Sequence, residues 1–178
     1  MEKNRQGLLH IYCGDGKGKT SAAVGMAVRA AGCGMKVLVI RFLKTENSGE
    51  VEVLRSIPGI TVPPCERTFD FVFRMTEEQK QEAALYYQSR FEAAAKEAVQ
   101  GQYDLLILDE ILASCNYGMV RETSVVEFLQ NRPEKLEVVL TGRNPSETFL
   151  ELADYVSEIC MRRHPYEKGI PARRGIEF

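Results

Sequence analysis

Three glycines alternate with polar residues between a short apolar run and a helical pattern near the start of the chain. The segment is Cys13-Gly-Asp-Gly-Lys-Gly-Lys-Thr20. Glycines let successive backbone N–H groups converge around an anion, and a helix that begins beside them points its free N–H groups at the same place. Lys19 adds a positive charge for phosphates, and the Thr20 hydroxyl suits Mg²⁺. The segment predicts a phosphate-binding loop; the alternative is a glycine-rich turn.

The loop departs from the strict G-x-x-x-x-G-K-[ST] pattern, because Cys13 stands where the first glycine is expected. Gly14, Gly16 and Gly18 form an alternating run instead, and Lys17 supplies a second cation. The strand–loop–helix context still favours nucleotide binding over a simple turn.

Apolar runs alternate with helical patterns along the whole chain. We expect strands at residues 8–13, 36–42, 104–108, 137–140 and 155–160, and helices at residues 19–31, 76–99, 125–131 and 145–153. In the longest helix, Thr76 and Gln79 form a capping box, and an apolar stripe follows at spacings of three and four residues. The stripe is Ala84, Tyr87, Phe91, Ala94 and Ala98. This alternation predicts an α/β fold with a mainly parallel central sheet and helices on both faces.

Composition excludes several classes of protein. The chain has 178 residues, and we expect a single domain over residues 1–178. Its 23 Lys and Arg against 25 Asp and Glu give a net charge of −2, which argues against a protein that coats nucleic acid. The five cysteines never form a Cys-x-x-Cys spacing, which favours reduced thiols over disulfides or zinc. We expect no signal peptide and no membrane-spanning run, and therefore a cytoplasmic protein.

The C-terminal residues 162–178 carry five Lys or Arg against Glu167 and Glu177, a local charge of +3. Such a tail is either a solvated end or a segment that folds back over an anionic ligand.

Two further segments follow strands and are expected at the same edge of the sheet. Leu105-Leu-Ile-Leu-Asp109-Glu110 predicts a buried strand that delivers acids to its carboxyl end, where a P-loop protein binds magnesium. If the strand continued, Asp109 and Glu110 would point to opposite faces, so that one of them reaches the metal. Thr141-Gly-Arg143 follows another strand, and Arg143 is either a phosphate ligand or a surface ion pair.

Groups for covalent catalysis are missing from the sequence. His10 lies within a strand and His164 stands alone in the tail, so neither a Ser-His-Asp set nor a histidine cluster for zinc is present. We expect chemistry that depends on the positioning and charge neutralisation of a nucleotide.

With these residues identified, the chain resembles the P-loop type of ATP:cob(I)alamin (corrinoid) adenosyltransferases over residues 7–178. The matching segments include the phosphate loop with Ser21, Leu108-Asp-Glu110 and Thr141-Gly-Arg143. Others are Arg29-Ala-Ala-Gly32, Phe42-Leu-Lys44, Ala153-Asp154, His164-Pro-Tyr, Gly169-Ile, Ala172-Arg and Gly175-Ile-Glu-Phe178. The combination of this ending with the shortened loop is specific.

The resemblance implies a RecA-like P-loop fold, a homodimer, and transfer of the 5′-deoxyadenosyl group of ATP to cobalt(I) of a corrinoid, with triphosphate as the leaving group. By the same match, the residues from Gly14 to Ser21, Asp15 included, hold the triphosphate. Thr20 and Glu110 serve Mg²⁺ with Asp109 adjacent, and Lys19, Thr20 and Glu110 are the catalytic candidates. Partners would be the two small molecules and a reductant or flavodoxin-type protein. The basic tail then becomes part of the active site.

Two positions of this chain differ from the residues that are typical of the family it resembles. Family members carry Phe-x-Trp in the loop that closes on the lower face of the corrinoid, whereas this chain has Phe71-Val-Phe73 and no tryptophan. Arg41 stands where glutamine is common. An alternative for Phe69, Phe71 and Phe73 is a strand face packed on the core.

Two other functions remain open on the sequence. One is a P-loop kinase or ATPase that cleaves at phosphorus. The other is a non-catalytic carrier of a corrinoid or nucleotide.

Overall fold

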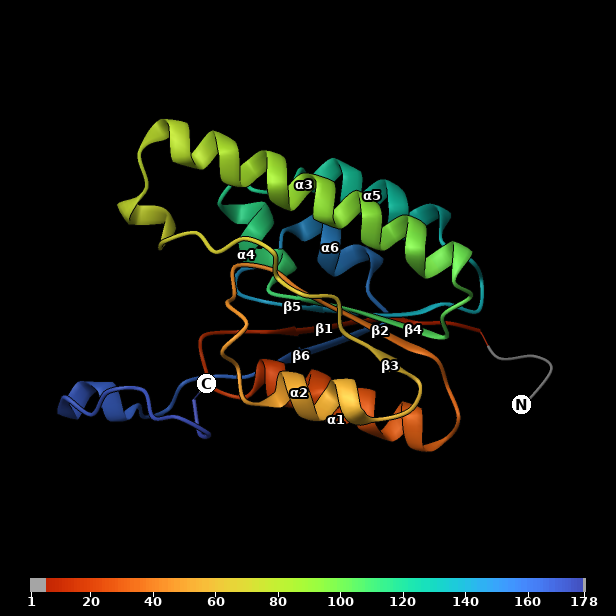
Figure 1. Ribbon diagram of the computed structural model, residues 1–178, viewed down its shortest axis with the longest axis horizontal. Coiled ribbons are helices and arrows are strands. Elements are labelled where there is room, and N and C mark those ends of the chain that lie inside the picture. Colours follow the sequence, from red (N-terminus) through yellow and green to blue (C-terminus); the bar gives the residue numbers. More distant parts are fainter. Residues whose placement is uncertain (1–5, 178) are drawn as a thin grey trace.

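All six strands of the computed structural model, which describes residues 6–177, belong to one parallel sheet (Figure 1). The sheet order is β3-β2-β4-β5-β1-β6. The strands are β1 (Leu9–Cys13), β2 (Val37–Arg41), β3 (Ile60–Thr61), β4 (Leu105–Asp109), β5 (Glu137–Thr141) and β6 (Tyr155–Glu158). The predicted parallel sheet is confirmed. Met1–Arg5 and Phe178, the last residue of the C-terminal motif, lie outside the described residues.

Helices cover both faces of the sheet and form a three-layer structure, as predicted (Figure 1). One face carries α1 (Lys19–Gly32) and α2 (Glu50–Ser56). The other carries α3 (Glu77–Gln100), α4 (Ile111–Asn116), α5 (Glu122–Asn131) and α6 (Glu147–Leu152). Two short 3₁₀ helices, η1 (Val72–Arg74) and η2 (Pro165–Lys168), complete the described elements.

The order of the strands places β1, which precedes the glycine-rich loop, close to β4, which ends at Asp109. β5 lies between β1 and β4 and pairs with both, with Leu140 opposite Ile11 on one side and Leu108 on the other. Because all the strands are parallel, their carboxyl ends meet at one edge of the sheet. The phosphate loop, the acids after β4 and the turn after β5 therefore share that edge.

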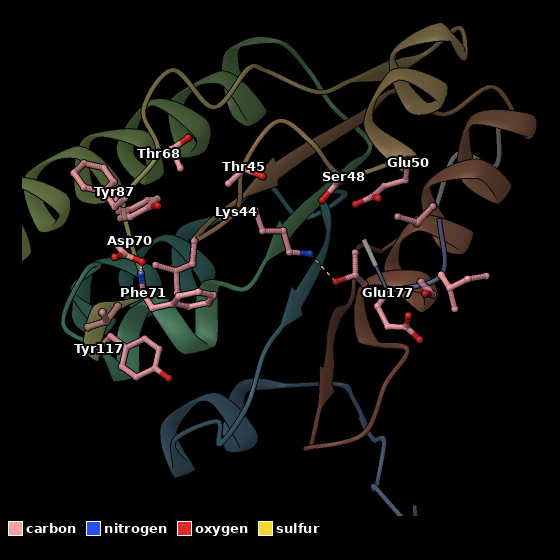
Figure 2. Close-up of a pocket in the computed structure, with 18 of the residues that line it drawn as sticks. Lys44, Thr45, Ser48, Glu50, Thr68, Asp70, Phe71, Tyr87, Tyr117 and Glu177 are labelled. Carbon is pink, nitrogen blue, oxygen red and sulfur yellow. Dashed lines mark hydrogen bonds between the residues drawn. The ribbon is translucent and has the colours of Figure 1, made fainter. Parts of the chain in front are cut away.

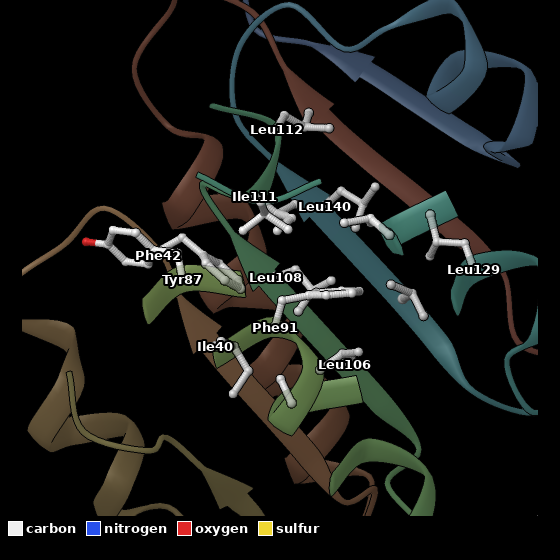
Figure 3. Packing of buried hydrophobic residues seen from close by; sticks show 14 of the residues in the cluster. Ile40, Phe42, Tyr87, Phe91, Leu106, Leu108, Ile111, Leu112, Leu129 and Leu140 are labelled. Atoms are coloured by element: carbon white, nitrogen blue, oxygen red, sulfur yellow. The ribbon is translucent and has the colours of Figure 1, made fainter. Parts of the chain in front are cut away.

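Each face of the sheet has its own apolar core. The larger core joins the sheet to α3, α4, α5 and α6, and Figure 3 shows Phe42, Phe91 and Leu108 packed within it. The smaller core joins the sheet to α1 and α2 through Ala23, Ala27 and neighbouring residues. β2 and β4 are buried at all five positions, which explains why their sequences do not alternate with polar residues.

The long helix α3 begins with the predicted capping box between Thr76 and Gln79. Its buried stripe contains Tyr87 and Phe91, as expected, but begins at Ala83 rather than Ala84, which is half-buried. Ala83 lies four residues before Tyr87, so it shares the buried face of the helix with Tyr87 and Phe91.

Several short elements were not predicted. They are α2, β3, α4 and the two 3₁₀ helices, and α5 begins three residues earlier than expected, at Glu122. A two-residue strand and one-turn helices carry too little periodicity to be recognised in a sequence. β6 ends at Glu158 and is exposed along its length, because it forms an edge of the sheet. Within residues 6–177, no helix combines the length and apolar character required to cross a bilayer.

Candidate functional site

The glycine-rich loop runs from the end of β1 into α1, as predicted. Gly18 precedes the helix with φ +123°, a conformation that favours glycine. At Gly16, a Cβ atom would lie 2.6 Å from the carbonyl oxygen of Ile159, so the close approach of the segment after β6 also requires glycine. Gly14 meets the same carbonyl. The glycines therefore shape the loop and let a second segment pack against it.

The segment after β6 holds the loop in place through two hydrogen bonds. The Gly16 N–H donates to the Ile159 carbonyl at 2.7 Å, and the Met161 N–H donates to Asp15 Oδ1 at 2.8 Å. The bond from Met161 lowers the pKa of the exposed Asp15 carboxyl. Asp15 therefore anchors the tail to the loop.

Lys19 is buried at the start of α1 and donates from Nζ to the Gly16 carbonyl at 2.9 Å. Burial lowers its pKa, opposed by the charge of Glu110 and assisted by that of Arg143. Its ammonium is thus held inside the loop. Lys17, by contrast, is exposed and donates to Glu177 Oε1 at 3.2 Å.

Asp109, at the end of β4, is the centre of a buried polar cluster. It is 2% exposed and accepts hydrogen bonds from the Thr20 hydroxyl (3.0 Å) and the Thr141 hydroxyl (2.6 Å). Lys44 Nζ also donates to Asp109 Oδ2, and to Thr20 Oγ1 at 2.8 Å. Three strand ends and the first turn of α1 thus converge on one carboxylate.

Glu110 follows in a left-handed conformation with φ +63° and precedes α4. β4 ends at Asp109, so the strand does not continue through Glu110. The expectation that the two carboxylates point to opposite faces depended on a continuing strand and therefore does not apply. Burial and the neighbouring Asp109 charge raise the pKa of Glu110, while Lys44 and Lys19 lower it. Asp109 and Glu110 therefore share Lys44 as a neighbouring positive charge.

Arg143 is exposed in the turn after β5. Its charge acts on the pKa values of Asp15, Lys19 and Glu110, so it lies at the same edge as the loop. The turn is tight, because a Cβ at Gly142 would lie 2.7 Å from Leu112 Cβ.

A cleft of about 1320 Å³ opens beside this cluster. Figure 2 shows aromatic side chains, including Phe71, Tyr87 and Tyr117, on one side, and Lys44 reaching across toward the side that carries Glu50 and Glu177. Of the predicted site residues, Thr20, Ser21, Phe71 and Phe73 line the cleft directly. The lining does not include Asp15, Lys17, Lys19, Asp109, Glu110, Arg143 or the loop glycines.

The aromatic loop is not a strand packed on the core. Phe71 and Phe73 are 65% and 79% exposed, and their rings stack with centroids 5.5 Å apart. Phe69 and Val72 pack against the core, whereas Phe71 and Phe73 do not belong to it. The strand alternative is wrong for this loop, because its backbone turns into η1. Two large apolar rings are thereby left exposed at the cleft.

The C-terminal tail returns to the cleft through Gly175, Ile176 and Glu177. Hydrogen bonds from Arg173, together with Lys17, hold the pKa of Glu177 at about 2. The tail therefore contributes residues 175–177 to the lining of the cleft, whereas residues 165–174 are exposed.

A partly buried ionic network links the segment after β2 to the segment that leads to the aromatic loop. Arg41, 2% exposed, donates to the Thr45 carbonyl at 2.8 Å and to Glu46 Oε1 at 2.6 Å. The same oxygen of Glu46 accepts from the Cys65 N–H at 2.5 Å, and Oε2 accepts from Arg55 at 2.8 Å. Residues 45–50 and the segment that leads to the aromatic loop are therefore tied together.

Sequence reasoning missed the roles of Lys44, Thr141 and Glu46 in these clusters. Lys44 follows β2 and Thr141 ends β5, at the same edge of the sheet as Asp109. These positions were the features of the sequence that could have indicated the contacts. Nothing in the sequence indicated the partners of Glu46.

The match to a protein family and the matches to individual relatives agree with each other. Residues 5–178 match the family described as ATP:corrinoid adenosyltransferase BtuR/CobO/CobP. A corrinoid adenosyltransferase of Pseudomonas aeruginosa is 33% identical over 180 residues, covering 99% of this chain and 86% of the relative. That of Escherichia coli is 32% identical, covering 99% and 88%. Corrinoid adenosyltransferase CobA of Salmonella typhimurium is 30% identical, with the same coverage.

Solved structures support the fold class at low sequence identity. A KaiC-like protein from Pyrococcus horikoshii superimposes with a TM-score of 0.51 at 14% identity, covering 89% of this chain and 75% of that one. The cytoplasmic domain of EssC gives 0.51 at 14% identity, and the match covers 97% of this chain but 37% of that one. These similarities concern the fold alone and agree with the P-loop architecture.

Proposed function

Because the chain belongs to the ATP:corrinoid adenosyltransferase family, and is thus a transferase that moves the adenosyl group of ATP to a corrinoid, we propose that the cleft beside Thr20 holds both substrates. The observation that carries this proposal is the shape and polarity of the cleft. Its volume of about 1320 Å³ exceeds the roughly 300–1,000 Å³ of a site for one small ligand. One side is polar and meets the phosphate loop, while the other presents exposed aromatic rings.

The phosphate loop binds the triphosphate of ATP in this proposal. The residues that take part are Gly14, Asp15, Gly16, Lys17, Gly18, Lys19, Thr20 and Ser21. Lys19 and Lys17 neutralise negative charge, and the N–H groups at the start of α1 add the favourable end of the helix dipole. Asp15 acts through the backbone, because its carboxylate holds Met161 and with it the tail. Arg143 supplies a further positive charge at the same edge.

The residues around Asp109 fit a magnesium ion. Mg²⁺ prefers oxygen ligands, and here the Thr20 hydroxyl lies 3.0 Å from the Asp109 carboxylate with Glu110 next in the chain. Thr20, Asp109 and Glu110 would hold the ion, which would help to neutralise the charge of the triphosphate. The partial burial of Glu110 makes a cation partner more favourable for its ionised form.

Phe71 and Phe73 contact the corrinoid from below. Both rings are exposed and would be covered by the apolar face of a macrocycle, which removes their area from water. Because the rings stack on each other, they would approach the ligand as one apolar surface. Water would thereby be displaced from the side of cobalt that faces them.

The chemistry requires little acid–base catalysis from the chain. Cobalt(I) is itself a strong nucleophile, and triphosphate departs from the 5′ carbon of the adenosyl group. The protein aligns the two reactants, and alignment of this kind is worth about 7–11 kcal/mol of a barrier. Lys19, Lys17 and the loop N–H groups stabilise the charge that develops on the departing phosphates.

We also propose a homodimer and a cytoplasmic location. The dimer is supported by β6, an exposed edge strand with Tyr155 and Val156 at about half exposure. Sedimentation equilibrium tests it, and a monomer at micromolar concentration would contradict it. The location is supported by five free cysteines, which suit a reducing compartment.

An anaerobic product assay tests the function. The protein is incubated with ATP, Mg²⁺ and chemically reduced cobalamin, and the products are separated by chromatography. We expect adenosylated corrinoid and intact triphosphate in equal amounts. ADP and orthophosphate without an alkylated corrinoid would indicate a kinase or ATPase, and stoichiometric binding without turnover would indicate a carrier.

A further inference from the structure

Lys44 belongs to the polar cluster around Asp109, although no part of the proposed mechanism uses it. Lys44 lies three residues beyond the end of β2 and directly follows Leu43, which has a left-handed φ of +52°. Lys44 Nζ then reaches Thr20 Oγ1 at 2.8 Å and Asp109 Oδ2. Figure 2 shows the Lys44 side chain extending across the cleft. The positive φ is unusual for a leucine, and this turn directs the ammonium group into the cluster.

Asp109 needs a cation because it is almost fully buried. Its other partners are neutral: the hydroxyl groups of Thr20 and Thr141. Among residues 6–177, Lys44 is the one cation within salt-bridge distance of Asp109. A carboxylate buried without a counterion is strongly unfavourable, and Lys44 supplies that counterion to Asp109.

The two oxygens that Lys44 contacts are the same two that the proposed function assigns to a divalent cation. An ammonium group and a metal ion cannot occupy the space between Thr20 Oγ1 and Asp109 Oδ2 at once, because both would need the same lone pairs. Their charges would also repel at close range inside a partly buried site.

We propose that Lys44 is a built-in counterion that occupies the metal position of the free protein and must be displaced before a divalent cation binds. This inference rests on the magnesium role proposed above. Lys44 already lines the cleft and is 20% exposed, so the displaced ammonium has open space beside it. There it can contact the phosphates of ATP, which gives it a new anionic partner.

The exchange couples metal binding to nucleotide binding. A metal ion alone must break the Lys44–Asp109 ion pair without compensation, whereas with ATP present the released ammonium gains the triphosphate. By linkage, each ligand then strengthens the binding of the other. The free protein is expected to bind free divalent cations weakly for this reason.

Titration of the full-length protein with Mn²⁺ alone, followed by electron paramagnetic resonance, tests the proposal. The variants are Lys44→Gln, which removes the charge but keeps an N–H donor, and Lys44→Arg, which keeps the charge. Lys80→Gln is the matched control, because Lys80 also lines the cleft but pairs with Glu77 on the surface. We expect Lys44→Gln to bind Mn²⁺ about ten- to a hundredfold more tightly than the unmodified protein, the range for loss of a competing charged hydrogen bond. Lys44→Arg and Lys80→Gln should bind as weakly as the unmodified protein.

Thermal melting provides a second readout that does not depend on activity. In metal-free buffer Lys44→Gln should melt at a lower temperature than Lys80→Gln, and Mn²⁺ should raise its melting temperature more than that of the control. If Lys44→Gln is unfolded without metal, we expect Mn²⁺ to refold it, and failure to refold in millimolar Mn²⁺ would overturn the proposal.

The outcomes separate this proposal from the proposed function. Equal, measurable Mn²⁺ affinities in all four proteins would refute displacement of Lys44 and leave the metal role intact. Weaker binding by Lys44→Gln would also refute it, because Lys44 would then organise the site rather than compete. Absence of Mn²⁺ binding by every protein would overturn both the metal role and the exchange.

Discussion

Replacing Glu46 with glutamine tests whether the ionic network around this residue stabilises the fold. Glu46 accepts hydrogen bonds from Arg41 at 2.6 Å, from the Cys65 N–H at 2.5 Å and from Arg55 at 2.8 Å. Burial alone would raise its pKa, but the Cys65 N–H and the two guanidinium groups lower it from an ordinary 4.5 to about 2. Glutamine has nearly the same shape but removes the negative charge.

The pKa shift sets an upper limit of about 3 kcal/mol on the contribution of this charge to the free energy of unfolding. The Glu46 side chain is 36% exposed, and solvent screening reduces that figure. The variant, however, also leaves Arg41 buried without a carboxylate, which adds a cost. We therefore expect Glu46→Gln to lose about 2 kcal/mol at pH 7, or a melting temperature lower by about 4–8 °C.

The loss should depend on pH in a defined direction. Because the pKa of Glu46 is lower in the folded state, its contribution is present above about pH 4.5 and disappears as the pH falls through about 2. Urea denaturation of both proteins at several pH values from 7 to 3.5 measures the difference. The gap between the two proteins should narrow toward the acid end.

Glu82→Gln is the control, since Glu82 pairs with Arg67 at 2.5 Å but both side chains are about half exposed. This surface pair should contribute less than about 0.5 kcal/mol. If Glu46→Gln cost no more than Glu82→Gln at pH 7, or if its cost did not change with pH, the reasoning about the network would be refuted.

Three further changes address the proposed active site. Lys19→Ala should reduce adenosyl transfer by about 100-fold or more while circular dichroism and melting stay close to those of the unmodified protein, because its role is electrostatic; normal turnover would contradict the phosphate-loop assignment. Phe73→Trp should raise kcat severalfold with little effect on stability, because Phe73 is 79% exposed; an unchanged or lower kcat would show that phenylalanine already suffices. Deletion of residues 164–178 should raise KM for ATP or corrinoid by about tenfold, equivalent to about 1.4 kcal/mol, with little change in melting temperature. Unchanged kinetics would show that the tail is a solvated end without a role in binding.

The local features of this chain were predictable because they depend on neighbours in sequence. The capping box at Thr76, the glycines before α1 and the apolar strands β2 and β4 all follow from patterns within a few residues. The long strands and helices and the parallel sheet were therefore predicted correctly. Short elements such as β3 and α4 were missed, since two to six residues do not establish a period.

The placement of the aromatic loop shows the limit of pattern reasoning. Alternation at Phe69, Phe71 and Phe73 fits a strand as well as a loop, and the structure decides for a 3₁₀ turn that leaves two rings exposed. Similarly, Asp109 and Glu110 were expected to diverge if β4 continued, but the left-handed backbone at Glu110 ends the strand. Such single-residue conformations depend on tertiary packing and leave no periodic signal.

Neighbouring residues in the sequence are enough to predict a glycine-rich phosphate loop between a buried strand and a helix, and acids at the end of a second strand at the same edge. Which charges meet depends on the tertiary structure. Lys44 reaches Thr20 and Asp109 across 24 and 65 positions of sequence, and Lys17 reaches Glu177 across 160. These contacts depend on strand order and on the path of loops, which bring together residues whose sequence neighbours give no indication of their partners.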